Sequence, residues 1–339
     1  MPWLLPVAKR FGLHGAPFFT QSSAVNQIFD LIHRGALEVP VEDGARISLP
    51  SLAVDLDAAD LPISFPLGGI AVVKLFKASQ FVNLQEVKWM FCNTFHKLEP
   101  TVGGEWRMRS IGPSVPSAYL DKRLEDDQSY GISLFSSDTS DDTVEWLNSK
   151  AATSVVYVSF GSVVSLEENQ VREIASSLRD NNNPFVWVLG ESESQKLPTN
   201  FLSETSEKGL VLSWCCQLQV LAHSAIGCFV THCGWNSTLE ALSTGVPMVA
   251  VPKWSDQTTN AKFISDVWGV GVRAKVNEEG IFTRMEISKC IKELMEGERG
   301  KGIRRNSLKW KELAREAMDE GGTSDSNIDD FVKELINST

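Results

Sequence analysis

The chain has 339 residues, 42% of them hydrophobic, which is too long for one typical domain and apolar enough for a substantial core. Lysine and arginine number 32 against 43 aspartates and glutamates, and the net charge is −11. This acidic balance argues against nucleic acid or an anionic membrane as a partner, and no apolar stretch reaches the length of a membrane span.

The first 110 residues predict an α/β arrangement with irregular stretches. Residues 36–66 are rich in proline and aspartate and predict loops. His14 stands just before an expected strand, and we assign it no catalytic role. The expected elements are a helix over 2–11, a strand over 16–20, a helix over 22–33, an amphipathic helix over 68–81 and a strand over 87–95.

Residues 111–143 are rich in proline, aspartate and serine and predict a linker between domains. After this linker, strands and helices alternate steadily, which is typical of a doubly wound α/β domain. Ser165, with Glu168 three residues later, predicts a helix cap. The expected strands cover 154–160, 185–189, 210–214, 226–231 and 247–252, and the expected helices cover 165–180, 235–242, 257–268, 283–296, 302–318 and the last residues of the chain.

The stretch from Trp214 to Gln257 carries the strongest functional signal. In an open α/β sheet, ligands collect beyond the carboxyl ends of the strands. Gly234 to Ser237 would begin a helix there, and free N–H groups at a helix start favour an anion such as a phosphate. His232 adds a donor at the end of the preceding strand. Asp256 and Gln257 follow the next strand and suit a polyol.

The same stretch resembles the signature box of plant UDP-dependent glycosyltransferases that modify small secondary metabolites and hormones. The resemblance runs from Trp214 through THCGWNS to Asp256-Gln257 with its spacing intact. It implies a GT-B fold of two Rossmann-like doubly wound domains, the N-terminal one incomplete. The implied limits are a partial acceptor-binding domain at 1–112, a linker at 113–145, a UDP-sugar domain at 146–320 and a C-terminal helix at 321–339 that packs back toward the first domain.

The resemblance also implies a role for each member of the box. Trp214 would stack on uracil beside the backbone of Cys215, Gln217 would lie near the ribose, and Glu240 would hold the ribose hydroxyls. Cys216 departs from the family, which has proline there, and we expect a slightly looser loop. The diphosphate would fall to Ser162, His232, Gly234, Asn236 and Ser237, and the sugar to Trp235, Trp254, Asp256 and Gln257; the closing glutamine is usually associated with glucose donors.

Simpler interpretations exist for single residues. Trp214 and Trp235 alone would be core aromatics, His232 a buried histidine, and Asn236 with Ser237 a helix cap; the intact spacing favours a nucleotide-sugar site. Four cysteines with His223 and His232 raise the question of zinc. Adjacent pairs such as Cys215-Cys216 point to opposite faces, so we expect neither a metal nor a cofactor.

The sequence therefore predicts UDP-glucose-dependent, inverting, metal-independent glucosyl transfer to small aromatic acids or phenols. In the family, a histidine near the N-terminus and an aspartate before the residues Met-Pro-Trp are catalytic, and this chain begins at that Met-Pro-Trp; we assign no catalytic residue. The alternative is an inactive relative that binds UDP-sugar without turnover. A nicotinamide-dependent oxidoreductase is disfavoured, because no glycine fingerprint follows the strand at 154–160. We expect the protein to be cytoplasmic, because six cysteines fit a reduced compartment and the opening residues lack the features of a signal peptide. We also expect a monomer.

Overall fold

The computed structural model describes residues 3–42, 44–49, 52, 54–63, 71, 73, 78–100, 108–131 and 140–338. Most of the expected helix over 68–81 lies outside these residues. Contacts divide the chain into two compact units. The smaller unit comprises Met1–Val115, Trp254–Asn260 and Leu313–Thr339, and the larger comprises Pro116–Lys253 and Ala261–Glu312.

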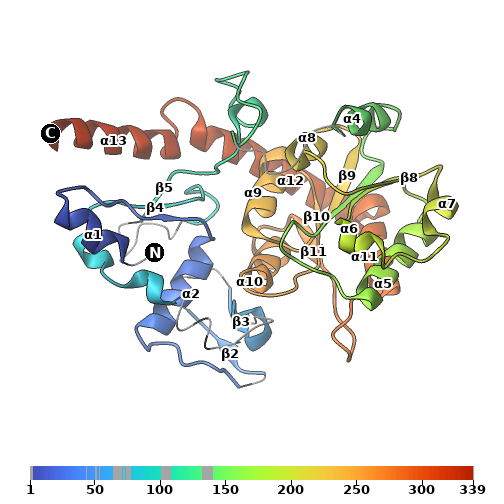
Figure 1. The fold of residues 1–339 in the computed structure, drawn as a ribbon, viewed down its shortest axis with the longest axis horizontal. Coiled ribbons are helices and arrows are strands. Elements are labelled where there is room, and N and C mark those ends of the chain that lie inside the picture. Colours follow the sequence, from blue (N-terminus) through green and yellow to red (C-terminus); the bar gives the residue numbers. More distant parts are fainter. Residues whose placement is uncertain are drawn as a thin grey trace. The chain divides into compact units, whose positions relative to one another are not determined.

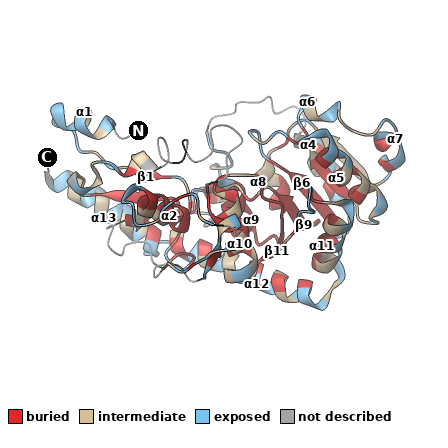
Figure 2. Cartoon of the chain, turned by 90° about the horizontal axis from the view of Figure 1, so that it is seen from below, coloured by how far each residue is buried: buried red, intermediate tan, exposed pale blue. Residues whose placement is uncertain are grey.

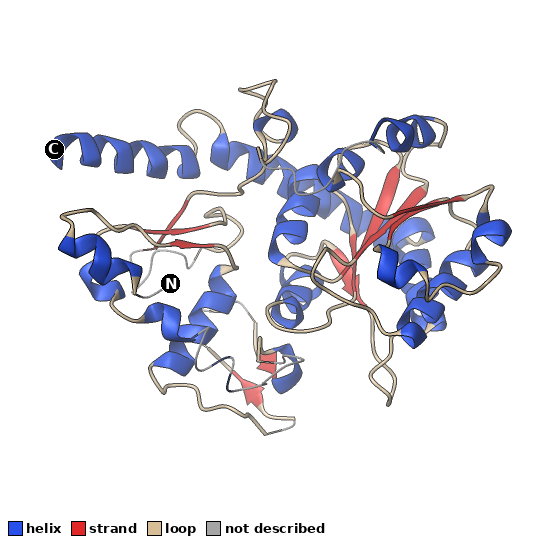
Figure 3. Ribbon diagram, viewed as in Figure 1, coloured by secondary structure: helices blue, strands red, loops and turns tan. Residues whose placement is uncertain are grey.

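A six-stranded sheet forms the centre of the larger unit, and every strand pairing in it is parallel (Figure 3). β6 lies between β9 and β7, so the chain winds outward from it in both directions, as in a doubly wound fold. In spatial order the strands are β11 (Gly271–Arg273), β10 (Met248–Ala250), β9 (Ile226–Thr231), β6 (Val155–Ser159), β7 (Phe185–Val188) and β8 (Gly209–Leu212).

The central strands are buried along their whole length because helices cover the sheet on both faces. Every residue of β6 and of β9 is buried, as is typical of parallel strands (Figure 2). α5 packs against α11, and α8 packs against α9 on the other face of the sheet (Figure 1). The helices of this unit are α4 (Ser140–Asn148), α5 (Glu168–Asp180), α6 (Glu191–Ser194), α7 (Phe201–Thr205), α8 (Gln217–Leu221), α9 (Trp235–Thr244), the π-helical turn Phe263–Val267, α11 (Arg284–Glu296) and most of α12 (Glu298–Met318).

Two expected helix starts are wrong. α5 begins at Glu168 behind the N-cap Glu167, while the Ser165 hydroxyl donates instead to Glu193 Oε1 over 2.9 Å. α12 begins at Glu298, four residues before the expected start, and runs through Gly300. A Cβ on Gly300 would lie only 2.5 Å from the Glu293 carbonyl oxygen, so glycine here permits a close approach of α11 rather than ending a helix.

The smaller unit contains a parallel three-stranded sheet in the order β1-β4-β5. Its α2 helix is capped twice: Ser22 accepts from the Val25 N–H, and the buried Glu99 carboxylate accepts from the Ser23 and Ala24 N–H groups, each over 2.9 Å. Its elements are α1 (Leu4–Arg10), β1 (Phe18–Phe19), α2 (Ser23–His33), β2 (Arg46–Ile47), β3 (Leu56–Asp57), β4 (Met90–Cys92), β5 (Met108–Ser110), α13 (Thr323–Ser338) and the 3-10 turns Ala58–Asp60, Ala78–Phe81 and Leu84–Glu86.

The C-terminal helix α13 lies against β4 and β5 of the smaller unit. Asn327 Nδ2 donates to the Ser110 carbonyl oxygen over 2.8 Å. Phe331 meets the rings of Trp89 and Phe91 edge-on, with centroid separations of 5.4 and 5.0 Å. Among the residues that the structure describes, no helix is both long enough and apolar enough to cross a membrane.

Candidate functional site

The carboxyl ends of β6 and β9 lie side by side at the point where the direction of winding reverses. Ser159 at the end of β6 pairs with Thr231 at the end of β9, so the segments that follow them, which contain Gly161 and His232, leave the same edge of the sheet. Ligands of open α/β sheets bind at such a switch point. The predicted residues of the larger unit follow β6, β8 and β9 at this edge.

Two glycines enclose the imidazole of His232. A Cβ built on Gly161 would lie 3.0 Å from His232 Cε1, and one built on Gly234 would lie 2.5 Å from Nε2. Gly161 also has a φ of 70°, a left-handed conformation that favours glycine. The ring therefore packs directly against the backbone at both glycines. A larger residue at either position would displace the ring.

His232 is neutral at physiological pH. Burial lowers the pKa of its imidazole from 6.5 to about 4, and a backbone hydrogen bond to Ser159 opposes this shift only in part. A neutral imidazole carries one N–H, and the hydrogen bond with the Ser159 backbone uses it. The ring would therefore line an anion site as a neutral polar group, not as a fixed positive charge.

The start of α9 offers backbone donors beside this ring. Gly234 is the N-cap and has no side chain with which to cap the first-turn N–H groups. Asn236 is exposed there. Trp235 is only 3% exposed and packs against Trp268, with ring centroids 6.0 Å apart, so it anchors this end of the helix. N–H groups at the start of a helix, together with the positive end of its dipole, favour anion binding.

A hydrogen-bonded network surrounds the buried carboxylate of Glu240, one turn further along α9. Gln217 Nε2 donates to Glu240 Oε2 over 2.6 Å and contacts the Ser237 hydroxyl over 2.9 Å. The Tyr130 hydroxyl donates to Glu240 Oε1 over 2.7 Å. The Tyr157 hydroxyl, from β6, donates to Gln217 Oε1 over 3.3 Å. Side chains from three elements and the linker thus orient one carboxylate.

Burial raises the pKa of Glu240 above its ordinary value of 4.5, while hydrogen bonds from Gln217 and Tyr130 oppose the rise. The carboxylate is only 5% exposed. A buried acceptor of this kind suits the neutral hydroxyls of a polyol, which can satisfy it without adding charge.

The other predicted residues of the larger unit lie around this network. Trp214 is half-buried in the loop between β8 and α8, and Cys215 beside it is buried with its Sγ 3.6 Å from the Tyr157 hydroxyl. Cys216 is the N-cap of α8 with a φ of −71°, close to the value that proline would fix, so the departure from the family keeps this backbone conformation. Ser162 is exposed in the turn after β6.

Trp254, Asp256 and Gln257 belong to the smaller unit and form a cluster of their own at the start of α10 (Gln257–Lys262). The Trp254 N–H donates to Gln257 Oε1 over 3.1 Å, and Asn260 Nδ2 donates to Asp256 Oδ2 over 3.0 Å. Asn260 in turn accepts from the Ser22 hydroxyl, which ties this segment to the start of α2.

Sequence reasoning missed Tyr157 and Tyr130. Tyr157 gave a usable signal: it is the one polar-tipped aromatic in the strand VVYVS, and a buried tyrosine hydroxyl needs a partner. Tyr130 gave none, because it stands in an irregular segment whose conformation no periodicity predicts.

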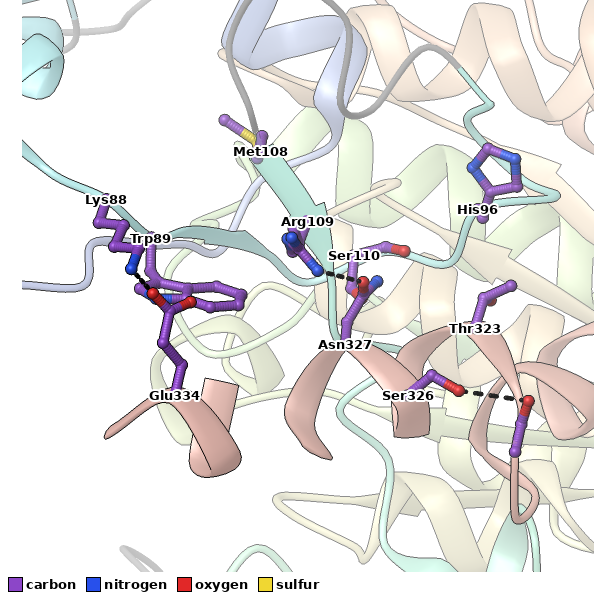
Figure 4. A pocket seen from close by; sticks show the side chains of 11 residues that line it. Lys88, Trp89, His96, Met108, Arg109, Ser110, Thr323, Ser326, Asn327 and Glu334 are labelled. Carbon is purple, nitrogen blue, oxygen red and sulfur yellow. Dashed lines mark hydrogen bonds and ion pairs between the residues drawn. The ribbon is translucent and has the colours of Figure 1, made fainter. Parts of the chain in front are cut away.

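A pocket in the smaller unit is lined by none of the predicted site residues (Figure 4). Lys88 pairs with Glu334 across it, and Arg109 donates to Asn327 Oδ1 over 3.4 Å while stacking on Trp89. Its charged groups therefore already have partners within the protein. Among the described residues, no group of three or more histidine, cysteine, aspartate or glutamate side chains is placed to hold a metal ion.

Comparisons with known proteins identify the family of this chain. The family described as UDP-glucoronosyl and UDP-glucosyl transferase matches residues 131–313. Mogroside I-E synthase of Siraitia grosvenorii is 52% identical over 99% of this chain and 75% of its own length. UDP-glycosyltransferase 74E2 of Arabidopsis thaliana is 50% identical over 98% of this chain and 75% of its own.

A solved structure shows the same fold. Os79 from O. sativa, in complex with UDP, is 37% identical with a TM-score of 0.88, over 98% of this chain and 75% of its own. The chain therefore belongs to the UDP-glycosyltransferase family, and the predicted GT-B fold class is confirmed. It is an enzyme family, these three relatives are plant proteins, and this chain spans about three quarters of their length.

Proposed function

We propose that the chain transfers glucose from UDP-glucose to a small aromatic acid or phenol, with inversion at the anomeric carbon and without a metal. The observation that supports this best is the joined arrangement of Glu240, Gln217 and Ser237 beside the His232 ring. It combines acceptors for a ribose diol with donors for a diphosphate at one sheet edge. The rice relative that shares this fold was solved with UDP.

In this proposal, the larger unit binds the nucleotide and stabilises it as a leaving group. As the bond from glucose to UDP breaks, negative charge grows on the diphosphate. The first-turn N–H groups after Gly234, which lie beside the His232 ring, would donate to that charge. Because these donors are fixed before the reaction, they need no reorganisation as the charge develops. The roles of Trp254, Asp256 and Gln257 toward the glucose remain predictions from the family resemblance.

The type of acceptor decides how much help the reaction needs. A phenol must lose its proton as it attacks the anomeric carbon, and a positioned general base contributes about 10²–10⁴-fold to such a step. An aromatic acid has a reference pKa of about 4 and is already ionised at neutral pH. We therefore propose that this chain forms glucose esters faster than glucosides.

A transfer assay tests this proposal. Purified chain is incubated with radiolabelled UDP-glucose and, in parallel, with benzoate or with phenol, and the glucosylated product is separated and counted. Glucose ester forms in excess over glucoside, and a chelator leaves both rates unchanged. The control is the same reaction with Asn236→Ala, which loses the exposed amide at the start of α9 and slows transfer to both acceptors alike.

Equal rates on benzoate and phenol would refute the preference for acids. UDP-glucose binding without any transfer, across a panel of acids and phenols, would identify the chain as a binding relative instead of an enzyme.

A further inference from the structure

Residues 116–131 form an ordered loop of the larger unit. Ser117 organises it: its N–H donates to Asp127 Oδ2 over 2.8 Å, its hydroxyl donates to Asp121, and the same hydroxyl oxygen accepts from the Leu124 N–H over 2.9 Å. The Ala118 N–H donates to the Asp127 carbonyl oxygen. These hydrogen bonds connect the first part of the loop with residues 121–127 and hold the loop in one conformation.

The end of this loop carries Tyr130 to Glu240. The phenol hydroxyl donates to Glu240 Oε1 over 2.7 Å, across a separation of 110 residues in sequence. Tyr130 is 56% exposed, whereas Glu240 is 5% exposed. An exposed side chain on a loop thus covers a buried carboxylate.

Both oxygens of Glu240 already accept a hydrogen bond. Gln217, the first residue of α8, donates to Oε2, and Tyr130 donates to Oε1. A ribose presents two neighbouring hydroxyls that would donate to the same carboxylate. Since Glu240 has almost no exposed surface, a ribose can reach it only if a covering group leaves, and Tyr130 is the exposed one.

We propose that Tyr130 is a further residue of the nucleotide site, which occupies the position of a ribose hydroxyl on Glu240 until the nucleotide displaces it. This inference rests on the proposed binding of UDP. It makes the loop a determinant of nucleotide affinity: every binding event exchanges one hydroxyl donor on Oε1 for another, and affinity is lower than the direct contacts alone would give.

The test compares two ligands on two proteins by isothermal titration calorimetry. Tyr130→Phe removes only the hydroxyl, and UDP binds it about 3- to 10-fold more tightly than it binds the unmodified chain. The 2′,3′-dideoxy analogue of UDP has no hydroxyl for Glu240, so its affinity changes less than about twofold. Tyr119→Phe, the same substitution on the same loop, leaves the affinity for both ligands unchanged.

Weaker or equal UDP binding by Tyr130→Phe would overturn the inference, because the hydroxyl would then support the nucleotide instead of competing with it. An equal gain for UDP and for the dideoxy analogue would also overturn it, since the competition would not concern the ribose hydroxyls. Tyr130→Leu repeats the comparison should Tyr130→Phe fold poorly. Absence of UDP binding to the unmodified chain is a different result, which refutes the proposed function itself.

Discussion

The amide of Gln217 and the carboxylate of Glu240 lie 2.6 Å apart, joined by a hydrogen bond from Nε2 to Oε2. This contact connects the first residue of α8 with the middle of α9, two helices that follow different strands of the sheet. α9 carries both the carboxylate of Glu240 and the first-turn N–H groups, and Gln217 of α8 holds that carboxylate in place. The proposed nucleotide site therefore depends on both helices.

Replacing Gln217 by methionine should weaken UDP binding by roughly tenfold. Methionine keeps the length of the side chain but removes the amide, so the contact with the ribose that the family resemblance implies is lost, and Glu240 is no longer held in place through Oε2. The dissociation constant is measured by isothermal titration calorimetry. Gln219→Met, on the same helix, should bind UDP as the unmodified chain does, and equal weakening by both variants would indicate a general effect on α8.

Gly234→Ala should displace His232 without straining the backbone. The φ of Gly234 is −60°, which alanine adopts freely, but the new Cβ would lie 2.5 Å from His232 Nε2. We expect at least about tenfold weaker UDP binding, with a loss of stability of about 1–3 kcal/mol. Gly302→Ala in α12 serves as a control that should be neutral or stabilising by about 1 kcal/mol.

Glu240→Gln should stabilise the free protein at neutral pH while it weakens UDP binding. Burial raises the pKa of Glu240, so the folded chain binds this proton more tightly than the unfolded chain does. As the pH rises from the ordinary value of 4.5 through the raised pKa, the unmodified chain loses stability and the variant does not. The difference in melting temperature between the two should therefore be near zero at pH 4.5 and grow toward pH 7.5. A constant or shrinking difference would contradict this assignment.

Phe331→Ala should loosen the smaller unit and leave the larger one intact. Phe331 packs edge-on against Trp89 and Phe91, and its removal costs about 3–5 kcal/mol at a fully buried site and less here, where it is half-buried. Hydrogen exchange should speed up in β4 and β5 but not in β6 and β9. Val332→Ala, on the same helix with 45% of its surface exposed, is the matched control and should leave exchange unchanged.

Sequence alone was enough to predict five of the six strands in the sheet of the larger unit, and it missed the edge strand β11 (Gly271–Arg273). Strands such as 226–231 are short, mostly apolar runs, which are typical of buried parallel strands. The signature box likewise placed His232 and Glu240 at one edge of the sheet, because strand ends and helix starts alternate there. Features that the periodicity of a single segment determines were therefore predictable.

The features that escaped prediction depend on contacts between distant segments. Gly300 is a residue type that often ends a helix, yet here it lies within α12 and lets the Glu293 carbonyl of α11 come close to the backbone. Ser165 has the spacing of a cap, yet Glu193 binds its hydroxyl. Tyr130 lies 110 residues from Glu240, and only the folded loop brings them together. In each case the role of the residue is set by a partner that the local sequence does not identify.

The affinity of the purified chain and of Glu240→Ala for UDP, measured by isothermal titration calorimetry at pH 7.5, tests the nucleotide site most directly. Hydrogen bonds to a charged group contribute about 1.5–3 kcal/mol each, so we expect the variant to bind UDP roughly 10- to 100-fold more weakly. Affinities within twofold of each other, for two proteins of equal folded content, would contradict the assignment of this sheet edge to the nucleotide.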